Sequence, residues 1–138
     1  NETDIDVVMN AGRYTLLDQS AANELFPAAL KKGVSIVSVG VFNSGVLANP
    51  VKGATFEYLP ASDEIIAKAQ KIGAFLKERG ISLTAAALQF PLRHPAVTSV
   101  LTGSRNIGEL LSNIKDFDTQ LPENIWKELE DAQLIERL

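Results

Sequence analysis

Three short apolar runs rich in β-branched residues alternate with segments of helical periodicity, and this alternation restricts the fold of the chain. The runs cover residues 5–9, 34–42 and 97–102. Strands that alternate with helices predict a parallel sheet with right-handed crossovers. The predicted order β-α-β-α-α-β-α-α therefore indicates an α/β fold, either a small open sheet or the last three strands of a (β/α)8 barrel. We expect the first run to form a strand buried on both faces, as parallel strands usually are, and the other two runs to form buried strands as well.

The helices are expected in the segments between and after these runs, at residues 18–33, 62–80, 82–90, 106–117 and from Pro122 onward. In the first of them Pro27 suits a first helical turn, so its regular part could begin near Asn23. The segment 62–80 is the clearest, because Ser62 can cap its start and Gly80 can end it. Its apolar residues recur at helical spacing and predict one buried face: Ile65, Ala69, Ile72 and Leu76. In the first helix the same spacing predicts an inner face of Leu25, Phe26, Ala29 and Leu30. We expect Trp126 to anchor the last helix by packing.

Composition narrows the class of protein. The 138 residues suit a single domain, here residues 1–138, and the net charge of −4 disfavours nucleic acid as a partner. The absence of cysteine excludes disulfides and thiolate metal sites. No apolar run is long enough to span a bilayer, so we predict no membrane partner and a cytoplasmic location. The lone histidine, His94, stands before Pro95 and is expected to be structural, with no metal role.

The most specific local pattern is the turn that follows the third run. Gly103, Ser104 and Arg105 precede Asn106, a good N-cap, and Glu109 can complete a capping box three residues later. A strand that turns into a capped helix presents free N–H groups and the positive end of a helix dipole to an anion. The pattern fits a nucleotide phosphate site, or equally an ordinary turn with a surface arginine.

Other candidate residues lie in the loops after the first two runs. Arg13 and Tyr14 follow the first run and could line a substrate pocket, although Arg13 could instead pair with Asp18. The loop 43–60 is long for a connection of this kind, which is typical of functional loops. Its residues Phe56, Glu57 and Tyr58 could cover a polyol substrate or simply hold the loop in place.

Three segments resemble the aldo/keto reductase superfamily. G-S-R-x-x-x-E-L-x-x-N at 103–113, preceded by HPAVTSV, is similar to its cofactor segment. AGRYTLLDQSA at 11–21 and GVFNSGVLA at 40–48 resemble the D-threo-aldose (L-fucose) 1-dehydrogenase and pyridoxal 4-dehydrogenase-like branch. The resemblance implies a (β/α)8 TIM barrel and makes these strands its sixth, seventh and eighth. Since the chain also starts at Asn1 without a methionine, we expect it to be the C-terminal part of a longer protein.

The resemblance also implies a cofactor, NADP or NAD, and assigns residues to it. Gly103, Ser104 and Arg105 match positions that meet the adenosine phosphate, and Glu109 and Asn113 match those that contact the adenine edge. The segment expected to cover the pyrophosphate consists of Val41, Phe42, Asn43, Ser44 and Gly45. Here the usual aromatic-Ser-Pro-Leu pattern is absent, so Phe42 either replaces the stacking aromatic or the stacking is lost. Arg13, Tyr14 and Tyr58 are the substrate candidates.

The family's catalytic tyrosine, lysine, aspartate and histidine belong to earlier strands, so no catalytic residue carries over and the chain alone is predicted inactive. The resemblance implies a small sugar or aldehyde as substrate of the full protein. Missing N-terminal strands, or an oligomer, would cover the open sheet edges. Two alternatives remain: a non-catalytic nucleotide-binding or regulatory module derived from a truncated barrel, and a small independent α/β domain that binds protein.

Overall fold

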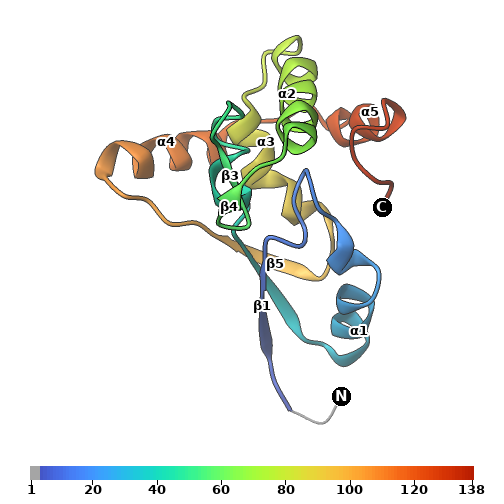
Figure 1. Ribbon diagram of the computed structural model, residues 1–138. Coiled ribbons are helices and arrows are strands. Elements are labelled where there is room, and N and C mark those ends of the chain that lie inside the picture. Colours follow the sequence, from blue (N-terminus) through green and yellow to red (C-terminus); the bar gives the residue numbers. More distant parts are fainter. Residues whose placement is uncertain (1–3) are drawn as a thin grey trace.

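The computed structural model describes residues 4–138, and its helices and strands follow the predicted order, except that the loop 43–60 contains a short hairpin, β3 and β4, that was not predicted (Figure 1). The strands and α-helices are β1 (Val7–Ala11), α1 (Leu25–Lys32), β2 (Ser35–Val39), β3 (Thr55–Phe56), β4 (Leu59–Pro60), α2 (Asp63–Lys77), α3 (Leu83–Gln89), β5 (Val97–Leu101), α4 (Ile107–Asp118) and α5 (Ile125–Asp131). Short 3₁₀ turns occupy Ser20–Ala22, Asn43–Gly45 and Phe90–Arg93. The α/β class predicted from the alternation is confirmed.

In the part of the chain that the structure describes, β1, β2 and β5 form a three-stranded parallel sheet in the order β1-β2-β5. The pairing of β2 with β5 is irregular at one place. Ile36 lies opposite Val97, but the next residue, Val37, lies opposite Ser99, so Thr98 is an extra residue on β5. The Thr98 hydroxyl donates a hydrogen bond to the Ile36 carbonyl at 3.3 Å. Thr98 therefore forms a bulge near the start of the edge strand β5.

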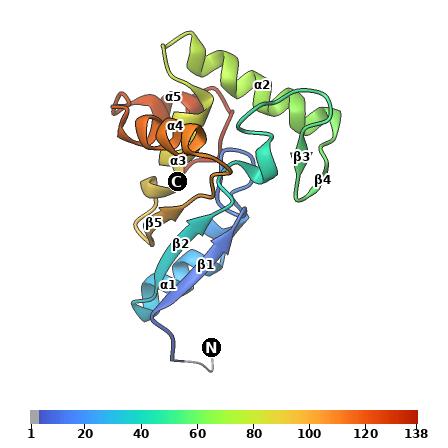
Figure 2. The ribbon, with the colours of Figure 1, turned by 90° about the vertical axis from the view of Figure 1, so that its left-hand side faces the viewer.

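The two faces of this sheet differ in burial. Figure 2 shows α1 behind β1 and β2, and the side chains on that face, such as Ile36 and Ser38, are buried. On the opposite face Met9 is 61% and Leu101 is 50% exposed. The prediction that the first strand is buried on both faces is thus wrong for β1, and β5 is exposed on the same face, because no described element packs there. We refer to the surface of Val7, Met9 and Leu101 as the open face.

The helices α2, α3 and α5 and the loop after β1 enclose the hydrophobic core. Phe26, Phe90 and Leu129 are among its fully buried side chains. Trp126 packs edge-on against Phe90, with ring centroids 5.7 Å apart, which confirms its packing role. α2 is capped by Ser62, whose hydroxyl accepts a hydrogen bond from the Ile65 amide. The buried face of α2 consists of Ile66, Ala69, Ile72 and Leu76. The predicted Ile65 is only partly buried.

Two helices begin later than predicted. Asp18 accepts hydrogen bonds from the Ser20 amide and hydroxyl, which makes a local turn in place of the first helical turn. α1 then begins at Leu25, and Gly33 ends it in the left-handed conformation, φ 68°. The exposed Leu25 and Leu30 do not belong to its inner face. The last helix, α5, begins at Ile125 and not at Pro122.

The helix α4 has an apolar stripe without a partner. Its apolar side chains recur at the spacing of one helix face, and all of them are exposed: Ile107, Leu110, Leu111, Ile114 and Phe117. None of the side chains of this fully described helix is buried. Within residues 4–138, no helix combines the length and the apolar character that a membrane crossing requires.

Candidate functional site

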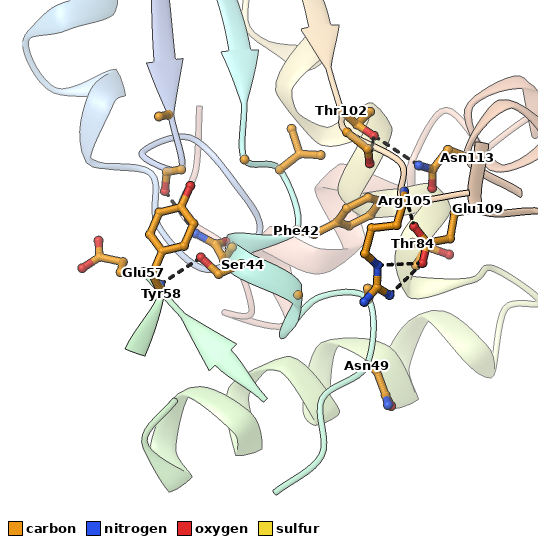
Figure 3. A pocket seen from close by; sticks show the side chains of 18 of the residues that line it. Phe42, Ser44, Asn49, Glu57, Tyr58, Thr84, Thr102, Arg105, Glu109 and Asn113 are labelled. Carbon is orange, nitrogen blue, oxygen red and sulfur yellow. Dashed lines mark hydrogen bonds and ion pairs between the residues drawn. The ribbon is translucent and has the colours of Figure 1, made fainter. Parts of the chain in front are cut away.

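A cleft of about 1080 Å³ lies at the carboxyl ends of all three parallel strands (Figure 3). Ala11 and Gly12 contribute from the end of β1, Gly40 follows β2, and Thr102 and Gly103 follow β5. The remaining lining residues come from the loops after β1, β2 and β5 and from α3 and α4: Arg13, Val41, Phe42, Asn43, Ser44, Gly45, Ala48, Asn49, Glu57, Tyr58, Thr84, Arg105, Glu109, Ser112 and Asn113. The carboxyl ends of parallel strands are the usual position of ligand sites in α/β proteins.

Glycines keep the backbone of this cleft accessible. Gly12 and Gly40 have positive φ values of 69° and 66°. A Cβ on Gly40 would lie 3.4 Å from the Gly12 nitrogen, so the close approach of the two loops favours glycine at position 40. A Cβ on Gly103 would meet no atom within 4 Å, which leaves the backbone there open to a ligand. A group with phosphate oxygens fits such an open backbone.

The segment 41–45 forms one wall and is held by its own side chains. The Asn43 amide donates to the Gly12 carbonyl at 3.2 Å, and the Asn43 side-chain oxygen accepts from the Thr15 hydroxyl at 2.6 Å. Val41 is buried, whereas Phe42 is only partly buried and points into the cleft between its two ends (Figure 3). The Ser44 hydroxyl accepts a hydrogen bond from the Tyr58 amide at 3.0 Å. Asn43 and Ser44 therefore fix the shape of the wall.

Arg105 and Glu109 form the opposite end of the cleft and are bound to each other. The Arg105 Nε and Nη2 atoms donate to Glu109 Oε1 at 3.0 and 2.7 Å, and the Arg105 amide donates to Oε2 at 2.8 Å. Asn106 caps α4 by accepting from the Glu109 amide at 2.9 Å. The hydrogen bond to Arg105 lowers the pKa of Glu109 and that to Glu109 raises the pKa of Arg105. The carboxylate meets the amide of Arg105 instead of that of Asn106, so the predicted capping box is shifted by one residue.

Asn113 ties α4 to the end of β5. Its side-chain amide donates to the Thr102 hydroxyl at 3.1 Å and to the Ser104 hydroxyl at 3.2 Å. Figure 3 shows Thr102, Asn113, Arg105 and Glu109 at the same end of the cleft. Ser104 supports Asn113 but does not itself line the cleft.

A hairpin of β3 and β4 forms the rim at the other end. Its two turn residues, Glu57 and Tyr58, both have positive φ values, 51° and 64°, which suits a two-residue hairpin but is unusual for residues with side chains. Tyr58 is 92% exposed. The Arg13 guanidinium contacts Glu57 and also donates to Asp18 at 3.0 Å. Arg13 thus lines the cleft and also forms the expected pair with Asp18, while its role toward a substrate stays a prediction.

Electrostatics at this rim follow from the ion pairs. The hydrogen bond to Asp18, together with the charge of Glu57, raises the pKa of Arg13. Burial raises the pKa of Asp18, but the hydrogen bonds from Ser20 and Arg13 outweigh it, and the net pKa is lowered. Both groups therefore stay charged at neutral pH.

Tyr14 does not reach the cleft. The prediction that it lines the substrate pocket is wrong, because its side chain is buried in the core. Its ring packs against Phe26 and Phe90, with centroids 4.8 and 5.0 Å away. Burial raises the pKa of Tyr14 to about 12. His94 belongs to the same aromatic cluster, at 4.6 Å from Phe26, and its Nδ1 accepts from the Ala96 amide at 3.2 Å. This is the structural role expected for His94. The described residues contain no group of side chains suited to hold a metal ion.

Several lining residues were missed by the sequence analysis. Thr84 lies on α3, and its hydroxyl donates to the Asp116 carboxylate on α4, so only the packing of these helices brings it to the cleft. Ser112 comes from α4 and Asn49 from the long loop, and no local pattern marks them. Thr102 could have been found, because it stands directly before the glycine turn at the end of a strand.

Comparison with known proteins defines the family. The model of the aldo/keto reductase family matches residues 1–133, so the chain belongs to this family of oxidoreductases. It is 43% identical to the pyridoxal 4-dehydrogenase of Microbacterium luteolum and 40% identical to the D-threo-aldose 1-dehydrogenase of a Pseudomonas species, in each case over 97% of this chain. It spans only 40% and 41% of the length of these two relatives.

The solved structures agree on the fold. The aldo-keto reductase AKR11C1 of Bacillus halodurans in its apo form superposes with a TM-score of 0.72 at 23% identity, over 98% of this chain and 45% of that chain. Its holo form gives a TM-score of 0.68 at 21% identity. The parallel sheet and its helices are thus a fragment of a TIM barrel, which agrees with the absence of a described partner for the open face of the sheet.

Proposed function

We propose that the chain is the C-terminal, cofactor-binding part of an NAD(P)-dependent oxidoreductase that interconverts an aldose, or a related aldehyde or alcohol, and its oxidised product. Its family consists of enzymes that use NAD or NADP. The proposal takes its substrate class from relatives named for the oxidation of an aldose and of pyridoxal. The observation that carries it is the cleft, which combines an open glycine backbone with the Arg105 corner at the strand ends.

The residues of the cleft divide into two groups with different proposed roles. Gly103, Arg105, Glu109 and Asn113, with Ser104 in support, would hold the adenosine end of the cofactor. The segment 41–45 would lie along the pyrophosphate, with Phe42 as an aromatic surface. Arg13 and Tyr58 line the other end and are proposed to face the substrate. When bound, the nicotinamide cofactor supplies hydride transfer.

A direct test is titration of the 138-residue chain with NAD and NADP by calorimetry. We expect binding of at least one of them. We expect Gly103→Leu to abolish this binding, because the leucine side chain would occupy the open space at the cleft wall that the cofactor needs. A Cβ at this position meets no atom within 4 Å, so the substitution should not disturb the fold. Ala74→Leu, at an exposed position on α2, is the matched control and should bind like the native chain. Binding that survives Gly103→Leu unchanged would exclude this cleft as the cofactor site.

We further propose that the chain alone catalyses no reaction. Among the described residues that line the cleft there is neither a lysine nor a histidine to assist proton transfer. Assays with a range of aldoses and either cofactor should show no turnover above background. Turnover by the isolated chain would contradict this part of the proposal.

A second candidate function, a non-catalytic nucleotide-binding module, is favoured by the same absence of lysine and histidine in the described cleft. The two candidates differ in the rest of the protein. If the source protein carries a tyrosine, a lysine, an aspartate and a histidine upstream, and the full protein oxidises an aldose, the enzyme is correct. If the full protein binds nucleotide without turnover of any aldose or aldehyde, the module is correct.

A further inference from the structure

The charges that line the cleft cancel in pairs. Arg13 is paired with Glu57 and Asp18, and Arg105 is paired with Glu109. The described lining contains no lysine, so these two arginines are its cations. A fourth carboxylate, Asp116, lies behind Thr84 and contacts its hydroxyl. The cleft therefore has no excess positive charge to attract a further anionic group.

The pairing of Arg105 with Glu109 engages the part of the guanidinium that is best suited to phosphate. Nε and Nη2 form one edge of the planar fork, and both donate to the same carboxylate oxygen, Oε1. The other oxygen, Oε2, is held by the Arg105 amide, so the carboxylate is fixed at three points. A phosphate that approached this edge would have to displace Glu109 and would remain beside its negative charge.

We infer that Glu109 sets the specificity of this end of the cleft, so that it accepts an adenosine ribose with a free 2′-hydroxyl in preference to one with a 2′-phosphate. The inference rests on the proposed function, because it concerns the nucleotide expected at this end. A carboxylate accepts hydrogen bonds from ribose hydroxyls. A phosphate monoester carries about −1.5 to −2 charges at neutral pH, so the Glu109 carboxylate repels it. Arg105 thus serves to orient Glu109, and its presence alone does not indicate NADP.

The experiment compares two ligands that differ only in the 2′-phosphate, 5′-AMP and 2′,5′-ADP, by calorimetric titration of the native chain and of Glu109→Gln. The native chain is expected to bind 2′,5′-ADP no more tightly than 5′-AMP. In Glu109→Gln the affinity for 2′,5′-ADP should rise by about tenfold, because the guanidinium edge becomes available, while that for 5′-AMP should change by less than about threefold. Glutamine keeps an oxygen that can accept from the Arg105 amide, so the start of α4 is preserved.

Two further variants separate specificity from general charge. Glu123→Gln removes the same charge at an exposed position outside the cleft and should leave the ratio of the two affinities unchanged. Arg105→Ala in the Glu109→Gln background should remove the gain for 2′,5′-ADP, since that gain depends on the freed guanidinium.

The inference is overturned if the native chain binds 2′,5′-ADP about tenfold or more tightly than 5′-AMP, or if Glu109→Gln leaves the ratio unchanged. These outcomes leave the proposed function intact, because nucleotide still binds. Failure of both nucleotides, and of NAD and NADP, to bind would instead contradict the proposed function, and the inference with it.

Discussion

The Thr15 hydroxyl donates a buried hydrogen bond of 2.6 Å to the Asn43 side chain, which joins the loops after β1 and β2 across 28 positions of sequence. Asn43 also donates to the Gly12 carbonyl at 3.2 Å and has a positive φ of 46°. One side chain therefore holds together two of the three loops that build the cleft.

We expect Asn43→Ala to lower the free energy of unfolding by about 2–4 kcal/mol, because it removes two hydrogen bonds and places alanine in a left-handed conformation. Denaturant unfolding measures this change. Asn23→Ala, at an exposed position with φ −73°, should cost less than about 0.5 kcal/mol. Equal effects of the two substitutions would contradict the role assigned to Asn43.

The raised pKa of Tyr14 predicts that the free energy of unfolding falls at alkaline pH. Burial raises its pKa from 10.0 to about 12, so the folded state holds the phenolic proton more tightly than the unfolded chain does. The resulting stabilisation is complete below pH 10 and is lost as the pH rises towards 12. The free energy of unfolding of the native chain should therefore fall relative to that of Tyr14→Phe across this range. Parallel curves for the two proteins would show that Tyr14 is not buried in solution.

The lowered pKa of His94 predicts that the free energy of unfolding falls at acid pH. Burial, with a smaller effect from the charge of Arg93, lowers the pKa of His94 below 6.5. The unfolded chain then binds the proton more readily, so the stabilisation is present above pH 6.5 and is lost as the pH falls below it. Because the chain has one histidine, its imidazole proton signals can be followed by NMR without assignment. A midpoint above 6.5 would be contrary to this expectation.

The open face of the sheet and the apolar stripe of α4 predict self-association of the isolated chain. Met9, Leu101, Leu111 and Ile107 are all exposed, and β1 and β5 are unpaired at the sheet edges in the described structure. Met9→Lys combined with Leu111→Lys should shift the sedimentation of the chain towards the monomer, whereas Ala67→Lys on α2 should not. A native chain that sediments as a monomer at all concentrations would contradict the prediction.

Sequence periodicity was sufficient for the order of the strands and helices other than the hairpin β3-β4, while most of the cleft was predicted from the turns after the strands together with the family resemblance. The cleft residues could be found because they directly follow the strands, whose carboxyl ends meet in any parallel sheet. The burial of β1 could not be predicted, since it depends on whether a neighbouring element covers Met9. Thr84 was missed for a related reason, because it reaches the cleft only through the packing of α3 against α4.

Tyr14 and Arg13 show where local pattern fails. They are neighbours in sequence, and both follow β1, so pattern assigned them the same role. Their side chains have different surroundings, because Arg13 contacts Glu57, whereas Tyr14 packs against Phe26 and Phe90 in the core. An aromatic residue after a strand can serve either purpose, and the choice is made by the helix that packs beneath it.

The extra residue Thr98 on β5 has a consequence for the cofactor cleft. Successive side chains of a strand alternate between its faces, so one inserted residue exchanges the orientation of every later position. In an unbroken ladder Leu101 would share the side of Val97, and the segment that carries Gly103 and Arg105 would leave the sheet with its sides reversed. The bulge at Thr98 therefore sets the side of the sheet on which the arginine corner leaves β5, although Thr98 itself does not line the cleft.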